Sequence, residues 1–133
     1  MASIFSKIIS GEIPSFQVAE TDDFIAFLDI SPRTAGHTLV VPKKEVDYIF
    51  DLDPASYEAL WAFARKVAAA VEQAVPCKRV GIAVIGLEVP HTHIHLIPIN
   101  NVGDVNFSRP AAIVTEADYQ QITAEIRKAY AEG

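Results

Sequence analysis

The sequence predicts an α+β fold with a five-stranded, mainly antiparallel sheet and two main helices. Short apolar segments separated by turn residues indicate the strands, and a tight turn between the first two favours antiparallel pairing. Two longer segments carry apolar residues three and four positions apart, which indicates the helices. The chain has 133 residues, of which 50% are hydrophobic and 21% charged, so we expect a single domain covering residues 1–133.

The first half of the chain is expected to contribute one short helix and three strands. The helix covers residues 4–9, where apolar side chains recur at helical spacing before a glycine and a proline. Strands are expected over residues 16–19 and 24–29, and the four polar residues between them form a hairpin turn. A third strand is expected over residues 37–41, because Pro42 cannot donate to a sheet ladder.

The second half is expected to contribute both main helices and two further strands. Asp53 can cap the first helix, and Pro76 ends it. The apolar residues of that helix form one stripe: Leu60, Ala64, Val67, Val71 and Val75. Strands follow over residues 80–85 and 91–99. Thr115 opens the last helix, with a sequence that resembles a capping box.

Charge, cysteine content and hydropathy exclude several classes of protein. Eleven basic against seventeen acidic residues give a net charge of −6, which argues against bulk nucleic-acid binding. No apolar run approaches the roughly 18 residues of a membrane span, and the first residues lack the continuous apolar stretch of a signal peptide. Cys77 is the only cysteine, so no intrachain disulfide can form. We expect a soluble, cytoplasmic protein without membrane contact.

Three of the four histidines lie within five residues of one another. His91, His93 and His95 alternate along a predicted strand, so their side chains should project from one face. The residues between them face the other way, where they can pack on a helix or in the core. Each imidazole carries a donor and an acceptor, so a row of three without partners would be costly to bury.

Three interpretations of this row stay open at this point. The histidines could share no role, or two of them at alternate positions could bind zinc. The outer pair converges poorly on one ion, however, and no carboxylate or cysteine stands nearby at familiar ligand spacing. In the third interpretation, one neutral imidazole attacks phosphorus while its neighbours fix its tautomer and bind phosphate oxygens. Phosphoryl chemistry depends mainly on positioning and charge stabilisation, which favours this third interpretation.

The sequence around these histidines resembles that of a known family. The segment His91–Ile97 resembles the His-φ-His-φ-His-φ-φ signature of the histidine triad (HIT) nucleotide hydrolases and transferases, where φ is hydrophobic. Thr92 is a mild departure from this signature. Residues 4–14, 27–32 and 36–44 are similar to the opening segment, the nucleoside-contacting loop and the strand with a fourth histidine in the Hint-like branch.

The resemblance implies a HIT-like fold, a homodimer and a catalytic role for four histidines. His93 would be the nucleophile that forms a covalent nucleotidyl-histidine intermediate. His95 and His37 would orient it or contact phosphate, and His91 would contact the α-phosphate or the leaving group. The implied substrate is a purine nucleoside 5′-monophosphate derivative, such as a phosphoramidate, and no cofactor is expected.

The resemblance also implies a nucleotide site. Asp29 would accept hydrogen bonds from the ribose hydroxyls, although an aspartate before Ser31 and Pro32 could instead simply shape a turn. His37 taken alone could be structural. An apolar slot around the base would consist of Phe5, Ile8, Phe27, Leu28 and Ile30, side chains that could equally belong to the core.

The chain departs from the family pattern at three places. Some relatives bind zinc through cysteines and a histidine at the positions of Ser3, Ser6 and Glu45, so no such metal is expected here. Glu88 stands about where the branch has a serine, and an ionised carboxylate there would repel phosphate. Either Glu88 points away, or it is buried and protonated and could serve as an acid. Residues 100–110 lack the family's C-terminal signature. A catalytically weak nucleotide-binding or regulatory protein is therefore the alternative function.

Overall fold

The computed structural model describes residues 2–133, and Met1, which the expected domain includes, lies outside the described residues. The strands are β1 (Gln17–Glu20), β2 (Phe24–Leu28), β3 (Thr38–Pro42), β4 (Arg79–Ala83) and β5 (Ile94–Ile99). The helices are α1 (Ile4–Ile9), α2 (Pro54–Ala74) and α3 (Glu116–Glu132). Two short 3₁₀ helices, Ile49–Asp51 and Val102–Val105, lie in connections between these elements.

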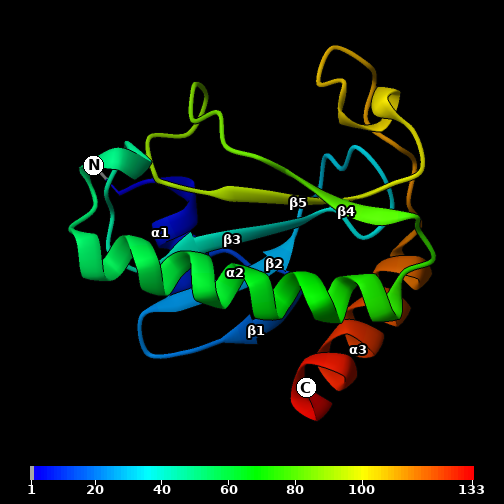
Figure 1. Cartoon of the computed structure of the whole chain (residues 1–133), viewed down its shortest axis with the longest axis horizontal. Coiled ribbons are helices and arrows are strands. Elements are labelled where there is room, and N and C mark those ends of the chain that lie inside the picture. The colour runs from blue at the N-terminus through cyan, green and yellow to red at the C-terminus, as the bar shows by residue number, and fades with distance from the viewer. Residues whose placement is uncertain (1) are drawn as a thin grey trace.

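Within residues 2–133 the strands form one sheet in the order β1-β2-β3-β5-β4, with every neighbouring pair antiparallel (Figure 1). The predicted α+β class with a five-stranded antiparallel sheet is confirmed. The predicted hairpin turn is also present, since the Thr21 N–H donates to the Phe24 carbonyl at 2.8 Å. β1 and β4 form the two edges of the sheet.

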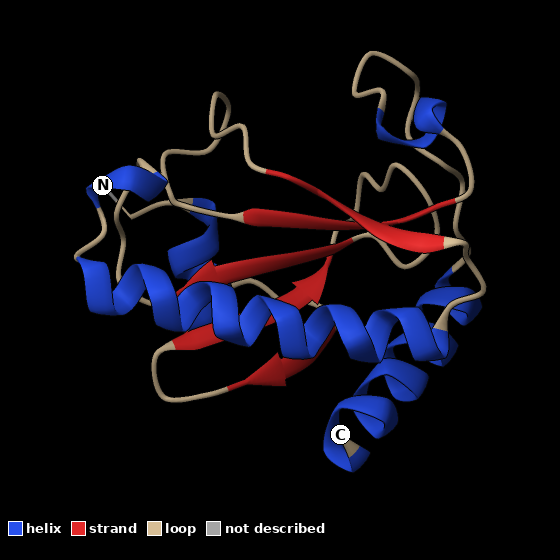
Figure 2. Ribbon diagram, in the orientation of Figure 1, coloured by secondary structure: helices blue, strands red, loops and turns tan. Residues whose placement is uncertain are grey.

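The long helix α2 and the last helix α3 cover one face of the sheet (Figure 2). Asp53 caps α2 as predicted, because its carboxylate accepts the Ser56 N–H at 3.1 Å. The predicted apolar stripe of α2 is buried against the inner face of β2, β3 and β5. On β5, Ile94 and Leu96 point into this core, as the alternation of side chains in a strand requires. Among the described residues, no helix has both the length and the hydropathy to cross a membrane.

The short helix α1 packs on the opposite face of the sheet. Gly11 follows its last turn with a positive φ of 87°, so the predicted stop signal is confirmed, and the structure adds Ser3 as the N-cap. Phe5 of α1 packs with apolar residues of β2 and β3 in a second, smaller cluster: Ile25, Phe27, Leu39 and Val41. His95 pairs with Leu39 across β5 and β3 and therefore belongs to this face.

The last two strands are shorter than predicted. β5 begins at Ile94 rather than at residue 91, because the Thr92 N–H donates to the Val46 carbonyl at 2.7 Å instead of joining a sheet ladder. β4 ends at Ala83 rather than at residue 85, since its last pairing is with His95. His91 and His93 therefore lie in the connection that leads into β5, and only His95 lies within a strand.

Candidate active site

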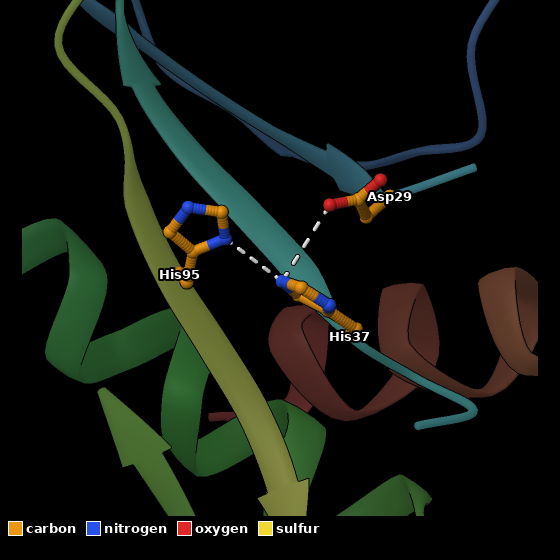
Figure 3. A group of neighbouring side chains, drawn as sticks. All are labelled: Asp29, His37 and His95. Atoms are coloured by element: carbon orange, nitrogen blue, oxygen red, sulfur yellow. Dashed lines mark hydrogen bonds and ion pairs between the residues drawn. The ribbon is translucent and has the colours of Figure 1, made fainter. Parts of the chain in front are cut away.

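Three polar side chains converge at one end of the central strands (Figure 3). Asp29 directly follows β2, His37 directly precedes β3, and His95 lies on β5. Gly36 makes the turn into His37 possible: its φ is +93°, and an added Cβ would lie 2.8 Å from a methyl carbon of Val75. The antiparallel pairing of β3 with β5 then places the His37 ring beside the His95 ring.

Hydrogen bonds fix the tautomers of these two histidines. The Arg33 backbone N–H donates to Nδ1 of His37 at 2.9 Å, so the proton of the neutral His37 ring is on Nε2. That Nε2–H donates to Nδ1 of His95 at 2.9 Å and lies 3.6 Å from the Asp29 carboxylate. The proton of His95 is therefore on its Nε2. The three side chains could also surround a metal ion, which would have to displace the proton between Nε2 of His37 and Nδ1 of His95 if it bound through those two atoms.

Both histidines are held in the neutral form. Burial lowers the pKa of His37 to about 3, and the nearby Arg33 charge acts in the same direction. Burial also lowers the pKa of His95 to about 4, assisted by repulsion from His37. At neutral pH the pair therefore offers a fixed N–H donor and carries no charge.

His93 has the opposite tautomer. Its Nδ1 donates to the His91 carbonyl at 2.7 Å, which leaves an unprotonated lone pair on Nε2. Nε2 has no hydrogen-bond partner among the described residues, and His93 lines the same cleft as His95. The ring centroid of His93 lies 5.0 Å from that of His95 and 5.0 Å from that of Phe5. An available lone pair beside a fixed donor is an arrangement suited to attack on phosphorus.

His91 differs from the expected role of a phosphate or leaving-group contact. Its side chain is fully buried, and both ring nitrogens already have partners within the protein. Nδ1 lies 2.7 Å from the Ser3 hydroxyl, and Nε2 donates to the Pro42 carbonyl at 2.7 Å. The strand starts only after His93, so the ring of His91 turns toward α1 rather than into the cleft. The direct contact with substrate that the resemblance implied for His91 is not compatible with this geometry.

A cleft of about 430 Å³ lies over His93 and His95. It brings together Phe5, Asp29, His93 and His95 of the expected site residues, while His37 lies just beneath as the partner of His95. The remaining lining residues are Ile4, Ser31, Arg33, Leu39, Ile85, Gly86, Leu87, Glu88, Val89 and Phe107.

Four residues of the expected base slot are not among the lining residues of this cleft. Phe27 and Ile8 lie behind it and pack with Phe5. Leu28 points to the opposite face of the sheet, into the core under α2, because it directly follows Phe27 in the strand. Ile30 lies on the surface with 78% of its area exposed. The participation of these side chains in base binding stays a prediction, and for Leu28 the core position explains its apolar character.

Arg33 and Phe107 line the cleft, although no sequence pattern identified them. The ring centroid of Phe107 lies 5.0 Å from that of His95, and the Arg33 guanidinium lies 5.5 Å from the Phe107 ring centroid. Arg33 also donates to the carbonyls of Asn106 and Arg109, which attaches the segment around Phe107 to the site. Only long-range contacts reveal these roles, since neither residue belongs to a periodic segment.

Glu88 lies at the rim of the cleft with an exposed side chain. The burial that a protonated Glu88 would require is therefore missing.

Asp29 does shape a turn, because one carboxylate oxygen accepts the Ser31 N–H at 2.8 Å. The other oxygen faces His37, so the turn and a place in the site are compatible.

Known proteins resemble this chain in sequence and in fold. Residues 10–102 match the family model described as HIT domain. An uncharacterised HIT-like protein of Borreliella burgdorferi is 34% identical over 131 residues, covering 92% of this chain and 94% of that protein. The adenosine 5'-monophosphoramidase of Schizosaccharomyces pombe is 36% identical over 103 residues, covering 76% of this chain and 77% of that protein.

A solved structure extends the similarity to nearly the whole chain. The crystal structure of a HIT-like protein from Bartonella henselae, described as involved in cell-cycle regulation, has a TM-score of 0.82 and 32% sequence identity, covering 96% of this chain and 95% of that chain. The matched family segment includes all four histidines discussed above. This chain therefore belongs to the HIT, or histidine triad, family.

Proposed function

We propose that this protein hydrolyses purine nucleoside 5′-monophosphate derivatives, such as phosphoramidates, through a covalent intermediate on His93. The observation that carries the proposal is the pair of fixed tautomers, an available lone pair on His93 Nε2 beside an N–H on His95 Nε2. Phosphoryl transfer requires a positioned nucleophile and donors for the phosphate oxygens. The name of the Schizosaccharomyces pombe relative, a monophosphoramidase, supports the substrate class.

In the first half of the proposed reaction, Nε2 of His93 attacks the phosphorus atom. A bond forms between Nε2 and phosphorus, and the bond from phosphorus to the leaving group breaks. An amine leaving group departs with the electron pair of that bond and takes a proton from water. The ring of His93 becomes positively charged, and the His91 carbonyl stabilises this charge by accepting the Nδ1–H. His95 donates its Nε2–H to a phosphate oxygen.

In the second half, water attacks the phosphorus of the intermediate. The bond between phosphorus and Nε2 breaks, its electron pair returns to the His93 ring, and the attacking water releases one proton. The products are the nucleoside 5′-monophosphate and neutral His93. Atoms and electrons balance with one water per turnover, so the proposal includes no cofactor.

The cleft offers a nucleoside two kinds of surface. One oxygen of Asp29 faces the site at 18% side-chain exposure, where it can accept hydrogen bonds from ribose hydroxyls. Apolar side chains that line the cleft can contact a purine ring, and one of them, Phe5, packs against Phe27. The purine nucleotide is thus the small-molecule partner that this proposal requires.

A catalytically weak nucleotide-binding or regulatory protein is the second candidate function. The carboxylate of Glu88 favours it, because an exposed negative charge at the rim of the cleft disfavours a phosphate group. The Bartonella henselae protein, described as involved in cell-cycle regulation, also agrees with a regulatory role.

Single-turnover labelling separates the two candidates. Excess wild-type protein is mixed with an adenosine phosphoramidate labelled at phosphorus, quenched in alkali and digested. We expect the label on the peptide that contains His93, and no labelled peptide from the His93→Ala variant. Glu88→Ser, assayed beside wild type, should increase the labelling rate if the carboxylate slows the attack. Tight nucleotide binding without any labelled peptide would support the second candidate and contradict hydrolysis.

The proposal also includes a homodimer that acts in the cytoplasm. β4 is an edge strand with exposed apolar side chains on it and directly after it: Ile82, Val84, Ile85 and Leu87. A second apolar cavity between this segment and α2 also reaches His93. A second copy placed against β4 would cover both the edge and the apolar surface. The single cysteine, Cys77, agrees with a reducing compartment.

A further inference from the structure

A second group of polar side chains lies beside the cleft, where α1 begins, and the proposed reaction does not use it directly. The group consists of Ser3, Ser6, Glu45 and His91. Oε1 of Glu45 accepts the Ser3 N–H at 2.7 Å and the Ser6 hydroxyl at 2.6 Å. The Ser3 hydroxyl in turn lies 2.7 Å from Nδ1 of His91. The group thus joins the N-terminus of α1 and the segment after β3 to the histidine row.

The directions of these hydrogen bonds follow from their partners. Nε2 of His91 faces the Pro42 carbonyl, which can only accept, so the neutral ring carries its proton there. Nδ1 is then an acceptor, and the Ser3 hydroxyl donates to it. Burial lowers the pKa of His91, which favours this neutral form. Ser3 Oγ also accepts the Ser6 N–H at 3.0 Å as the N-cap of α1.

The peptide unit between His91 and Thr92 connects this group to the nucleophile. Its carbonyl accepts the Nδ1–H of His93, and its N–H donates to the Val46 carbonyl at 2.7 Å. A peptide unit is planar, so a hydrogen bond on its N–H side also directs its carbonyl. The buried His91 side chain anchors the same unit to Ser3 and Pro42. Displacement of the His91 ring would therefore displace the carbonyl that sets the tautomer of His93.

Glu45 organises the group through hydrogen bonds rather than through its charge. The Ser3 N–H and the Ser6 hydroxyl lower the pKa of Glu45 to about 2, so the carboxylate stays ionised at neutral pH. Its side chain is 38% exposed, and its oxygen lies 3.9 Å from Nδ1 of His91, so solvent screens its attraction to that ring. The carboxylate holds Ser3 in place, and Ser3 holds His91.

We propose that Ser3 and Glu45 are positioning residues for His93. Through the buried His91, they hold the peptide carbonyl that keeps the proton of His93 on Nδ1 and its lone pair directed into the cleft. The effect of this positioning on turnover rests on the proposed function of His93 as nucleophile. The effect on the tautomer of His93 is a property of the free protein and does not depend on any substrate.

The test combines two readouts on the full chain. Ring-¹⁵N-labelled protein is examined by NMR without substrate, and adenosine phosphoramidate hydrolysis is measured in parallel. Wild type should show His93 protonated on Nδ1. Ser3→Ala should give a mixture of both His93 tautomers and a kcat lower by about 10-fold with KM changed less than about 2-fold, because small misplacements of a reacting group are costly. Ser3→Thr, which keeps a hydroxyl, should restore both readouts.

Matched variants separate positioning from folding. Ser10→Ala removes a hydroxyl at the other end of α1 that donates only to the Lys7 carbonyl, and it should leave both readouts unchanged. Glu45→Ala should shift the tautomer in the same direction as Ser3→Ala, and Glu45→Gln, which keeps the accepting oxygen, should restore it. Because Glu45 is exposed, its two variants test the inference even if Ser3→Ala fails to fold.

Two outcomes would overturn parts of this account, and they are distinguishable. If Ser3→Ala and Glu45→Ala lower the melting temperature but keep the wild-type tautomer of His93 and the wild-type kcat, the group is only structural and the inference is wrong. If wild type releases no nucleoside monophosphate, the proposed function fails. In that case the tautomer comparison alone still decides whether Ser3 and Glu45 position His93.

Discussion

The four histidines have different roles because their surroundings differ, although three of them stand in one short motif. His93 and His95 line the cleft with opposite tautomers, while His37 and His91 are buried beneath them. For both cleft-lining histidines the backbone sets the tautomer. The Arg33 N–H fixes the proton of His37, which in turn fixes that of His95, and the His91 carbonyl fixes the proton of His93. The alternation of histidines in the sequence predicted one shared face, and the hydrogen bonds decided each role.

Buried neutral histidines make stability depend on pH. The folded-state pKa values of His37 and His95 are about 3 and about 4, below the ordinary value of 6.5. Between about pH 6.5 and pH 4 the unfolded chain therefore binds more protons than the folded chain, and the free energy of unfolding falls as the pH falls. Each such histidine contributes at most about 1.4 kcal/mol per pH unit. Their contribution is fully retained above pH 6.5.

Urea unfolding between pH 7 and pH 5 measures this dependence, in a range above the titration of most carboxylates. For His95→Gln, the free energy of unfolding should depend less steeply on pH, with the slope reduced by the equivalent of up to one proton. Part of the slope should remain, because burial also lowers the pKa of His91. Arg33, Asp29 and His93 surround the pair and remain unchanged in this variant. An unfolding free energy that is flat over this range in wild type would contradict the neutral, buried state of the pair.

At the scale of elements, the segment between β5 and α3 closes one side of the cleft. Phe107 contacts the rings of His37 and His95, and Nη1 of Arg33 donates to the Asn106 and Arg109 carbonyls at 3.0 Å and 2.6 Å. The backbone N–H of Arg33 donates to His37, and its side chain donates to this segment. One residue thus connects the chemistry of the site with the element that covers it.

Arg33→Ala separates these two functions. The backbone N–H to His37 is retained, so the His37–His95 hydrogen bond should persist, while the segment around Phe107 loses its anchor. We expect the free energy of local opening over residues 104–110 to fall by about 1–3 kcal/mol, measured as faster amide hydrogen exchange there. Arg109→Ala, whose backbone carbonyl remains, is the matched control. Unchanged exchange in Arg33→Ala would show that the side chain is not the anchor.

At the scale of the whole molecule, the two edges of the sheet differ. α3 packs along β1, whereas β4 leaves Ile82 55% exposed at a free edge among the described residues. An uncovered edge with apolar side chains is a surface that proteins usually cover or pair. The proposed homodimer would pair this edge with a second copy and would cover the apolar cavity beside His93.

Sedimentation or light scattering measures the mass of the particle in solution. Wild type should have twice the mass of one chain, and Ile82→Lys should shift it to that of a monomer, because a buried lysine at the centre of a paired edge is costly. Ile113, which is 98% exposed in the connection to α3, provides the control, and Ile113→Lys should remain dimeric. A monomeric wild type would contradict the homodimer.

The sequence by itself determined the fold class, the helix ends and the approximate positions of the five strands, because these depend on local periodicity and caps. The predicted stop of the third strand before Pro42 is wrong, since Pro42 is the last residue of β3 and pairs with Phe24. It also placed His93 and His95 on one face. It could not predict that β5 starts after His93 or that His91 is enclosed, because these depend on partners far away in the chain, Val46 and Ser3. Arg33 and Phe107 joined the site for the same reason. The opposite orientations of Phe27 and Leu28, in contrast, follow from side-chain alternation within the predicted strand. Which nitrogen of a histidine holds its proton was decided by the folded structure, because that proton follows the donor or acceptor that folding places beside the ring. That partner is close in the sequence for His93 and far away for His95.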